Sequence, residues 1–227
     1  DRALYTNTTG SGNAAFGRKA LYTNNSNNNT ACGYLSFQTT TGNDNSGCGY
    51  LSGGQQTTGH GNTFVGHAAG YTTTTGSNCS ALGKNAWSSS ATASNEVTLG
   101  DGAISSLRCA DTSISSVSDR RDKTDIVDLP VGLDFINSVR PVKFKWQTRE
   151  GIPAKDGKIR AGFIAQELQE AQTGSEYLDL VYDANPDKLE AKQGKLVPVL
   201  VKAVQELSAK NDALAAEVEQ LKSQLNN

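Results

Sequence analysis

Glycine recurs at a nearly fixed interval through the first half of this sequence. The intervals are 16, 16, 17, 17 and 17 residues, and the six positions are Gly17, Gly33, Gly49, Gly66, Gly83 and Gly100. A fixed period below twenty residues is typical of a β-solenoid, in which each coil covers the apolar row of its neighbour. The repeat therefore predicts a β-solenoid of 16–17-residue coils, although such a polar composition would otherwise indicate a flexible linker.

Other positions repeat together with the glycine. An apolar residue stands directly before each glycine, and these residues are Phe16, Cys32, Cys48, Val65, Leu82 and Leu99. An Asn lies four or five positions before each glycine, at Asn13, Asn29, Asn45, Asn62, Asn78 and Asn95. Gly and Asn tolerate the left-handed backbone that tight corners need. We expect the apolar row to point inward and, because one thin coil has few apolar positions, three chains to share one axis.

The repeat register argues against a metal or redox role for the cysteines. Cys32 and Cys48 occupy positions that Phe and Val fill in other coils, so each is expected to act as a small hydrophobic side chain. No C-x-x-C spacing occurs, and His60 and His67 are expected at the surface. No metal and no cofactor are therefore expected.

Hydrolysis of a glycan by the first half is not expected either. Glycoside hydrolysis needs two facing carboxylates, and Glu96 and Asp101 are the one close pair before residue 118. Tyr34, Tyr50 and His67 share the position after the glycine, which leaves two interpretations open. They form either a stripe on which a host glycan stacks or a simple cover of the solenoid surface, and the second is favoured.

Composition changes sharply near residues 111–118. Before residue 118 lie 17 of the 23 glycines and all four cysteines, whereas all five prolines follow. Lys and Arg against Asp and Glu number 5 and 5 before this point but 16 and 18 after it. We expect a solenoid shaft at 1–110, an α+β domain at 111–195 and a helix at 196–227.

Charge and hydropathy limit the partners. A net charge of -2 gives no reason to expect nucleic acid or an anionic membrane, and the apolar runs are too short to span a bilayer. The chain contains no Met, which favours a fragment of a longer polypeptide.

The second half alternates between helical and strand patterns. The predicted elements are a helix at 129–139, a strand at 142–146, a turn at Asp156-Gly157, a strand at 158–164, a helix at 165–171, a strand at 178–182 and a turn at Asn185-Pro186. This order is typical of a small α+β domain.

A heptad pattern fills the C-terminal segment. Apolar residues alternate at spacings of 4 and 3 around one polar position, Asn211, and they are Leu200, Val204, Leu207, Leu214, Val218, Leu221 and Leu225. The pattern predicts a coiled coil of about four heptads. Val at a with Leu at d favours two strands by rule, whereas the shaft favours three.

Four segments of the second half, in order, resemble one family. They are SDRRDK at 118–123, RPVKFKW at 140–146, AGFIAQELQEA at 161–171 and LVKAVQEL at 200–207. Together they resemble the C-terminal intramolecular chaperone of phage endosialidase-type tailspikes and tail fibres. The first half resembles the head repeats of trimeric bacterial adhesins, whose units are usually shorter.

The first resemblance implies a self-cleaving module. Such a module trimerises, templates the upstream fibre and then cuts the bond before its first serine with a Ser–Lys dyad. Carried over by motif, the bond is Val117–Ser118, Ser118 is the nucleophile and Lys123 is the base, while Asp119 and Arg121 orient the turn and balance charge.

The residues present are compatible with such chemistry. No His lies in 118–227, which excludes a Ser-His-Asp triad within this domain. A lysine acts as a base when desolvation or a neighbouring cation lowers its pKa. Ser118 and Lys123 are five residues apart and share no face of an ideal strand or helix, so the dyad needs either a turn between them or a lysine from a neighbouring subunit.

The combined expectation is a phage tail-fibre or tailspike fragment. It would be a homotrimer in the virion, assembled in the host cytoplasm and extracellular when mature, with a single autocatalytic serine-endopeptidase event and no turnover of external substrates. A host-surface glycan or receptor would be bound by the shaft or by upstream regions. The alternative is a non-cleaving trimeric surface adhesin or structural fibre.

Overall fold

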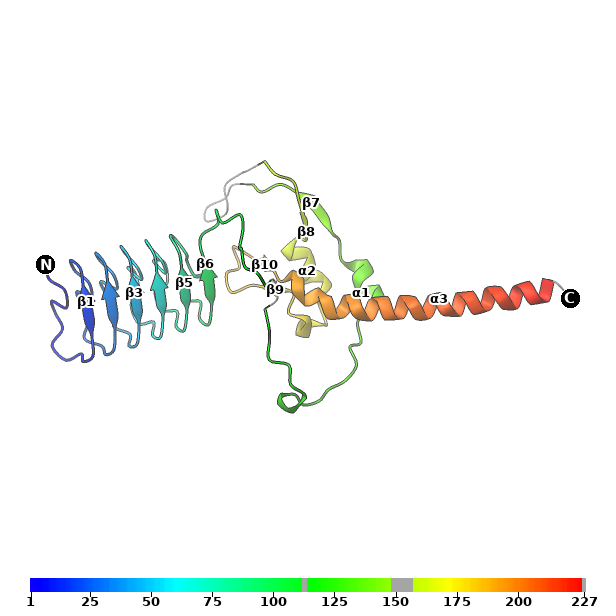
Figure 1. The fold of residues 1–227 in the computed structure, drawn as a ribbon, viewed down its shortest axis with the longest axis horizontal. Coiled ribbons are helices and arrows are strands. Elements are labelled where there is room, and N and C mark those ends of the chain that lie inside the picture. Colours follow the sequence, from blue (N-terminus) through cyan, green and yellow to red (C-terminus); the bar gives the residue numbers. More distant parts are fainter. Residues whose placement is uncertain (112–113, 148–156, 226–227) are drawn as a thin grey trace. The chain divides into compact units, whose positions relative to one another are not determined.

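The computed structural model describes residues 1–111, 114–147 and 157–225 (Figure 1). Its contacts divide the chain into two compact units, and the division along the sequence falls between Leu107 and Arg108. The first unit contains the repeats, and the second contains every helix of the described chain.

The first unit is a β-solenoid, as the glycine period predicted. Each coil contributes one three-residue strand to a single six-stranded parallel sheet in sequence order (Figure 1). The strands are β1 (Ala14–Phe16), β2 (Thr30–Cys32), β3 (Ser46–Cys48), β4 (Thr63–Val65), β5 (Ser80–Leu82) and β6 (Val97–Leu99). Equivalent repeat positions lie in register from strand to strand, for example Cys32 beside Cys48.

The repeat glycines form a column at the end of the strands. Gly49 has φ of 141°, a conformation that side chains disfavour, and a Cβ there would lie 2.3 Å from the carbonyl oxygen of Gly66. The column therefore explains why glycine recurs at this position in every coil.

A ladder of buried asparagines forms the opposite corner. Oδ1 of Asn29 accepts the backbone N–H of Asn45, and Oδ1 of Asn45 accepts that of Asn62. Each Nδ2 also donates to a carbonyl of the next coil, as Asn45 does to Gly59 at 3.0 Å. Asn29 and Asn45 thus each pair a backbone N–H that the corner would otherwise leave unpaired and also donate to a carbonyl of the next coil.

The six asparagines that the sequence analysis treated as one repeat position occupy two different positions of the coil. The corner contains the part-buried Asn13 and the buried Asn29, Asn45 and Asn62, whereas Cys79 fills the equivalent place in the next coil. Asn78 and Asn95 belong to the position one residue earlier, where the backbone is left-handed, with φ of 55° and 61°. The spacing of four or five residues reflected this difference.

The prediction that the residues directly before the glycines point inward was wrong. Phe16 is 70% exposed and Leu82 is 55% exposed, and Cys32 and Cys48 are also exposed. The inward strand position is the residue before them, which is Ala31, Phe64 or Ala81 in three of the coils. A shift of one residue exchanges the two faces of a strand.

One chain builds the solenoid core by itself, although we expected three chains to share it. The core is thin, and its large side chains fill the space left beside glycines. Phe37 occupies the space where Gly47 and Gly53 would carry a Cβ, and Phe64 does the same at Gly70. The buried members of this core are Ala20, Leu21, Ala31, Phe37, Phe64, Ala69, Cys79, Ala81 and Ala86.

The second unit is a small α+β domain that ends in a long helix, as predicted. Its elements are η1 (Arg120–Asp122), α1 (Leu133–Ser138), β7 (Val142–Phe144), β8 (Arg160–Gly162), α2 (Ala165–Ala171), η2 (Glu176–Leu178), β9 (Val181–Tyr182), β10 (Glu190–Ala191), η3 (Gln193–Leu196) and α3 (Val197–Leu225). Strands β7 and β8 pair antiparallel, and so do β9 and β10. The predicted turn at Asp156-Gly157 lies partly outside the described residues.

Two predicted elements are shorter in the structure, for local reasons. The helix predicted at 129–139 begins only at Leu133, because Leu129 precedes Pro130 and is disfavoured in helical conformation. The strand predicted at 178–182 is limited to β9, because Asp179 adopts a left-handed conformation with φ of 51°.

Helix α3 has two apolar faces with different surroundings. Val199 and Ala203, one turn apart, are buried in the domain, whose core also includes Leu168, Leu180 and Leu196. The heptad residues lie on another face and are exposed in the single chain, from 45% for Leu200 to 85% for Leu225. This exposure is consistent with a coiled coil.

Candidate functional site

A single 3-10 turn shapes the SDRRDK segment. Asp119 precedes the turn in extended conformation, and its side chain accepts the backbone N–H of Arg121 at 2.8 Å. The backbone N–H groups of Asp122 and Lys123 donate to the carbonyls of Asp119 and Arg120. This 3-10 turn reverses the direction of the chain between Ser118 and Lys123.

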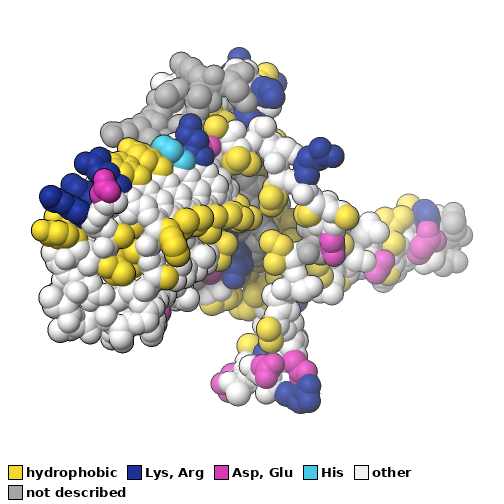
Figure 2. Space-filling view, turned by 60° about the vertical axis from the view of Figure 1, so that its left-hand side comes forward, with side chains coloured by type: hydrophobic (Ala, Val, Ile, Leu, Met, Phe, Trp, Pro, Cys, Tyr) yellow, Lys and Arg dark blue, Asp and Glu magenta, His cyan; other side chains and the backbone are white. Residues whose placement is uncertain are grey.

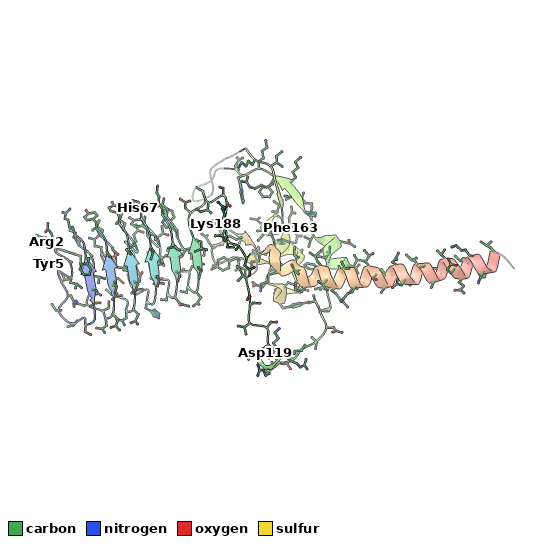
Figure 3. All side chains as sticks on the ribbon, in the orientation of Figure 1. Arg2, Tyr5, His67, Asp119, Phe163 and Lys188 are labelled. Carbon is green, nitrogen blue, oxygen red and sulfur yellow. The ribbon has the colours of Figure 1, made fainter. Side chains whose placement is uncertain are left out.

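The turn is held by an ion pair within it. The guanidinium of Arg121 grips the Asp119 carboxylate through Nε at 3.1 Å and Nη2 at 2.6 Å. Because of this pair, the pKa of Asp119 lies below its usual range and that of Arg121 is raised. Figure 3 shows Asp119 on this turn, which lies on the extended segment before α1.

The turn brings the two predicted dyad residues together within one chain. Nζ of Lys123 donates to Oγ of Ser118 at 2.6 Å. The sequence left open a turn between the two residues or a lysine from a neighbouring subunit, and the single chain contains such a turn. A general base needs the reverse bond, in which the serine hydroxyl donates to a neutral amine.

The surroundings of this pair are open to water. All six side chains from Ser118 to Lys123 are exposed, and Val117, on the other side of the predicted bond, is 87% exposed. None of the described residues therefore shields Ser118 from solvent, whereas a desolvated site requires that water be excluded.

An ion pair joins two of the segments that carry the family resemblance, and a side chain of a third caps a helix outside them. Arg140 of the second segment pairs with Glu167 of the third, and the pKa of Arg140 is raised by this contact. Glu206 of the fourth segment accepts the N–H of Leu133 at 2.8 Å and so caps the start of α1. The sequence analysis did not assign Glu206 a role, although its place in LVKAVQEL was a signal.

The aromatic stripe of the shaft forms a continuous stack instead of an open platform. The rings of Tyr34 and Tyr50 lie 5.6 Å apart, and those of Tyr50 and His67 lie 5.0 Å apart. The guanidinium of Arg18 covers the ring of Tyr34 at 5.6 Å. Since the neighbours occupy the ring faces on which a sugar would stack, the geometry favours a surface cover.

The Glu96 and Asp101 carboxylates bind local backbone groups. Glu96 accepts the N–H of Ser89 at 2.8 Å, and Asp101 accepts that of Ala103 at 2.9 Å. Among the described residues no cluster of three His, Cys, Asp or Glu side chains suits a metal ion. None of the described helices combines the length and the apolar character needed to cross a bilayer.

Residues 118–177 match the Peptidase_S74 family model, described as chaperone of endosialidase. No curated protein and no solved structure matches the chain. The matched region begins at Ser118 and covers the turn, the hairpin strands and α2. Residues 118–177 are therefore similar to the intramolecular chaperone of endosialidase, as the three segments within this range indicated; the fourth segment, at 200–207, lies beyond the match. The family's name points to a peptidase-related domain.

Proposed function

We propose that this chain is a piece of a phage tail fibre or tailspike whose second unit trimerises the solenoid shaft and then releases itself. Release is a single self-cleavage of the Val117–Ser118 bond, with Ser118 as nucleophile and Lys123 as base. The observation that carries this proposal is the 2.6 Å contact between Nζ of Lys123 and Oγ of Ser118 at the first residue of a chaperone domain.

The chemistry requires only these two side chains and water. A neutral Lys123 amine takes the proton of the Ser118 hydroxyl, and Oγ attacks the carbonyl carbon of Val117. The C–N bond breaks, the Ser118 nitrogen takes up a proton, and an ester links Val117 to Oγ. Water then hydrolyses the ester and leaves a carboxylate on Val117 and a free amino group on Ser118.

Assembly would activate the dyad. A lysine in water is charged at neutral pH and donates its hydrogen bond instead of accepting one. Packing of a neighbouring copy over the exposed turn would remove water and favour the neutral amine. Arg121 is already paired with Asp119, so Arg120 is the arginine that would supply an additional positive charge beside the site.

The homotrimer rests on α3. Its exposed heptad row provides an apolar face about 40 Å long, at 1.5 Å per residue. In this proposal the mature shaft belongs to the virion and contacts a host glycan or receptor, directly or through upstream regions. A non-cleaving fibre with the same trimer is the alternative.

Denaturing electrophoresis of the freshly expressed chain tests the proposal. The wild type is expected to give pieces of 117 and 110 residues, whereas Ser118→Ala gives the intact 23.9 kDa chain. Lys123→Ala and Lys123→Arg are also expected to stay intact, because neither side chain can accept the proton.

Light scattering of the Ser118→Ala chain serves as the control for folding, and it should report a trimer. An intact wild-type trimer would leave the alternative, a plain structural fibre. Cleavage of Ser118→Ala at the same bond would exclude Ser118 as the nucleophile.

A further inference from the structure

The outward face of the solenoid sheet carries an apolar row that the single chain leaves uncovered. We call it the outer row, and it consists of Phe16, Cys32, Cys48, Val65, Leu82 and Leu99. All six side chains are exposed, although four of them are large and hydrophobic. Figure 2 shows hydrophobic side chains in a row along the solenoid. An apolar row of this kind marks an interaction surface when it is contiguous.

Charge is absent from this face. Two positions earlier on each strand stand the other outward residues, which are Ala14, Thr30, Ser46, Thr63, Ser80 and Val97. Charged residues occur instead after the glycine, where Arg18, Lys84 and Asp101 stand. The sheet face is thus set apart from the charged edge of the same coils, which is the composition of an interface core.

The size of the face indicates what can cover it. Six strands spaced about 4.8 Å apart give a length of about 24 Å, and three-residue strands give a width of about 10 Å. The resulting area, on the order of 240 Å², is well below the roughly 800 Å² per partner of a stable complex. A freely diffusing partner would bind weakly, whereas a partner already held beside the shaft would not pay the entropy of association again.

The period of the row selects a second copy of this chain as that partner. Every coil places one apolar side chain at the same position of its strand, so two parallel copies side by side would bring identical residues opposite each other in each coil. We propose that the outer row is the contact between shafts in the homotrimer, with the row of each copy facing those of the other two. This proposal rests on the trimer of the proposed function, since the helices must first hold the copies together.

Two native cysteines lie on the row and make it directly testable. Cys32 and Cys48 are neighbours on β2 and β3, while Cys79 is buried and Cys109 lies beyond the solenoid sheet. The neighbouring Cys32 raises the pKa of the Cys48 thiol, so labelling is best read at Cys32. In a parallel three-fold assembly the three Cys32 thiols lie at one height.

The experiment uses the full chain with Ser118→Ala, to prevent cleavage, and with Cys48→Ser and Cys109→Ser. A short bis-maleimide is expected to join Cys32 of two copies, so that up to two thirds of the chains run as covalent dimers after denaturation. The matched control removes Cys32 as well and places the thiol at an exposed site off the sheet, Thr58→Cys. It is expected to remain single chains.

A charge variant on the adjacent rung separates contact from chance collision. Cys48→Asp in place of Cys48→Ser puts three like charges against one another and should lower the cross-linking rate at Cys32 at least about tenfold. Thr58→Asp should leave that rate unchanged. Both variants keep α3 intact, so light scattering should still report a trimer.

The outcomes distinguish the two proposals. A trimer by light scattering without cross-linking at Cys32 would overturn the outer-row contact and leave the trimeric chaperone standing. Equal cross-linking of Cys32 and the Thr58→Cys control would also overturn it. A monomeric chain would overturn the proposed trimer and the row contact together.

Discussion

At the residue scale, the buried asparagines show how a polar chain can form a solenoid. An apolar residue at Asn45 would leave the N–H of Asn62 without a partner and would remove one donor from the carbonyl of Gly59. Asn supplies an acceptor and a donor from the same amide, so it pairs both groups at once. The corner is therefore specified by hydrogen bonding and not by hydrophobic burial.

This role predicts a large effect of Asn45→Ala on the shaft. The substitution leaves the buried Asn62 N–H unpaired, at about 1–3 kcal/mol, and removes one of the two donors to the Gly59 carbonyl, which keeps its bond from Nε2 of Gln56. Hydrogen exchange at Asn62, measured in the Ser118→Ala trimer, should accelerate accordingly. Thr58→Ala, at an exposed position of the same coil, should have no effect.

A second substitution tests the donor separately. Cys79 fills the equivalent corner and donates through Sγ to the carbonyl of Ala93 at 3.2 Å. Asn45→Cys should therefore keep a weak donor, lose the acceptor and cost less stability than Asn45→Ala. Equal exchange rates of the Asn62 amide in Asn45→Ala, Asn45→Cys and Thr58→Ala would show that the asparagine ladder contributes little to stability.

At the scale of single elements, the connection between η2 and β9 depends on a charge contact. Asp179 has a left-handed backbone, and its carboxylate accepts from Lys192 at 2.6 Å and pairs with Lys195 at 3.4 Å. These contacts, Lys192 above all, lower the pKa of Asp179. The contact thereby fixes the point at which the chain turns into the β9–β10 pair.

The lowered pKa of Asp179 sets the pH range in which this contact stabilises the domain. Its contribution is present above the ordinary Asp value of about 3.9 and is lost as pH falls through the lower folded value. An NMR titration of the Asp179 carboxyl should give a midpoint below about 3.9, and Lys192→Met should move it upward. An unchanged midpoint in Lys192→Met would assign the shift to another group.

The elements also show what the sequence could and could not predict. The period identified the solenoid because glycine and its neighbours repeat in every coil. The SDRRDK segment singled out Ser118 and Lys123, which the structure brings within 2.6 Å of each other, but it left open whether the lysine comes from the same chain. The inward face could not be predicted, because strands of three residues are too short to show alternation. Ala31 and Gly47, which lie inside, also carry a weaker hydrophobic signal than Phe16 or Leu82, which lie outside.

At the scale of the whole molecule, the repeat of the solenoid limits what a chaperone would have to do for its folding. Each coil contacts the next one along the chain, 16 or 17 residues away, so a solenoid can fold by propagation within one copy. In the proposed trimer, bringing three copies into register is a separate task, and the small outer row is not expected to achieve it alone. Association through α3 would supply the high local concentration that this task requires.

Cleavage should accordingly depend on the exposed face of α3 and not on its presence alone. Leu214→Asp combined with Leu221→Asp should give a folded monomer that stays uncut, since both side chains lie beyond the domain core. The matched control, Ala209→Asp with Ala216→Asp, places the same charges on the opposite side of the heptad and should still trimerise and cleave. Full cleavage of the Leu214 and Leu221 variant would show that one chain suffices.

The column of repeat glycines fixes the length that each coil adds to the shaft. From Gly17 to Gly83, each repeat glycine packs against the repeat glycine of the next coil, so each coil adds one strand spacing of about 4.8 Å to the length of the shaft. The length of the shaft is therefore set in whole coils: duplication or loss of one coil changes that length by a fixed step and leaves each remaining contact between coils intact. Insertion of half a coil would set Gly49 against a side chain instead of Gly66. A gene that encodes such a shaft can vary the length of the fibre without redesigning any of its parts.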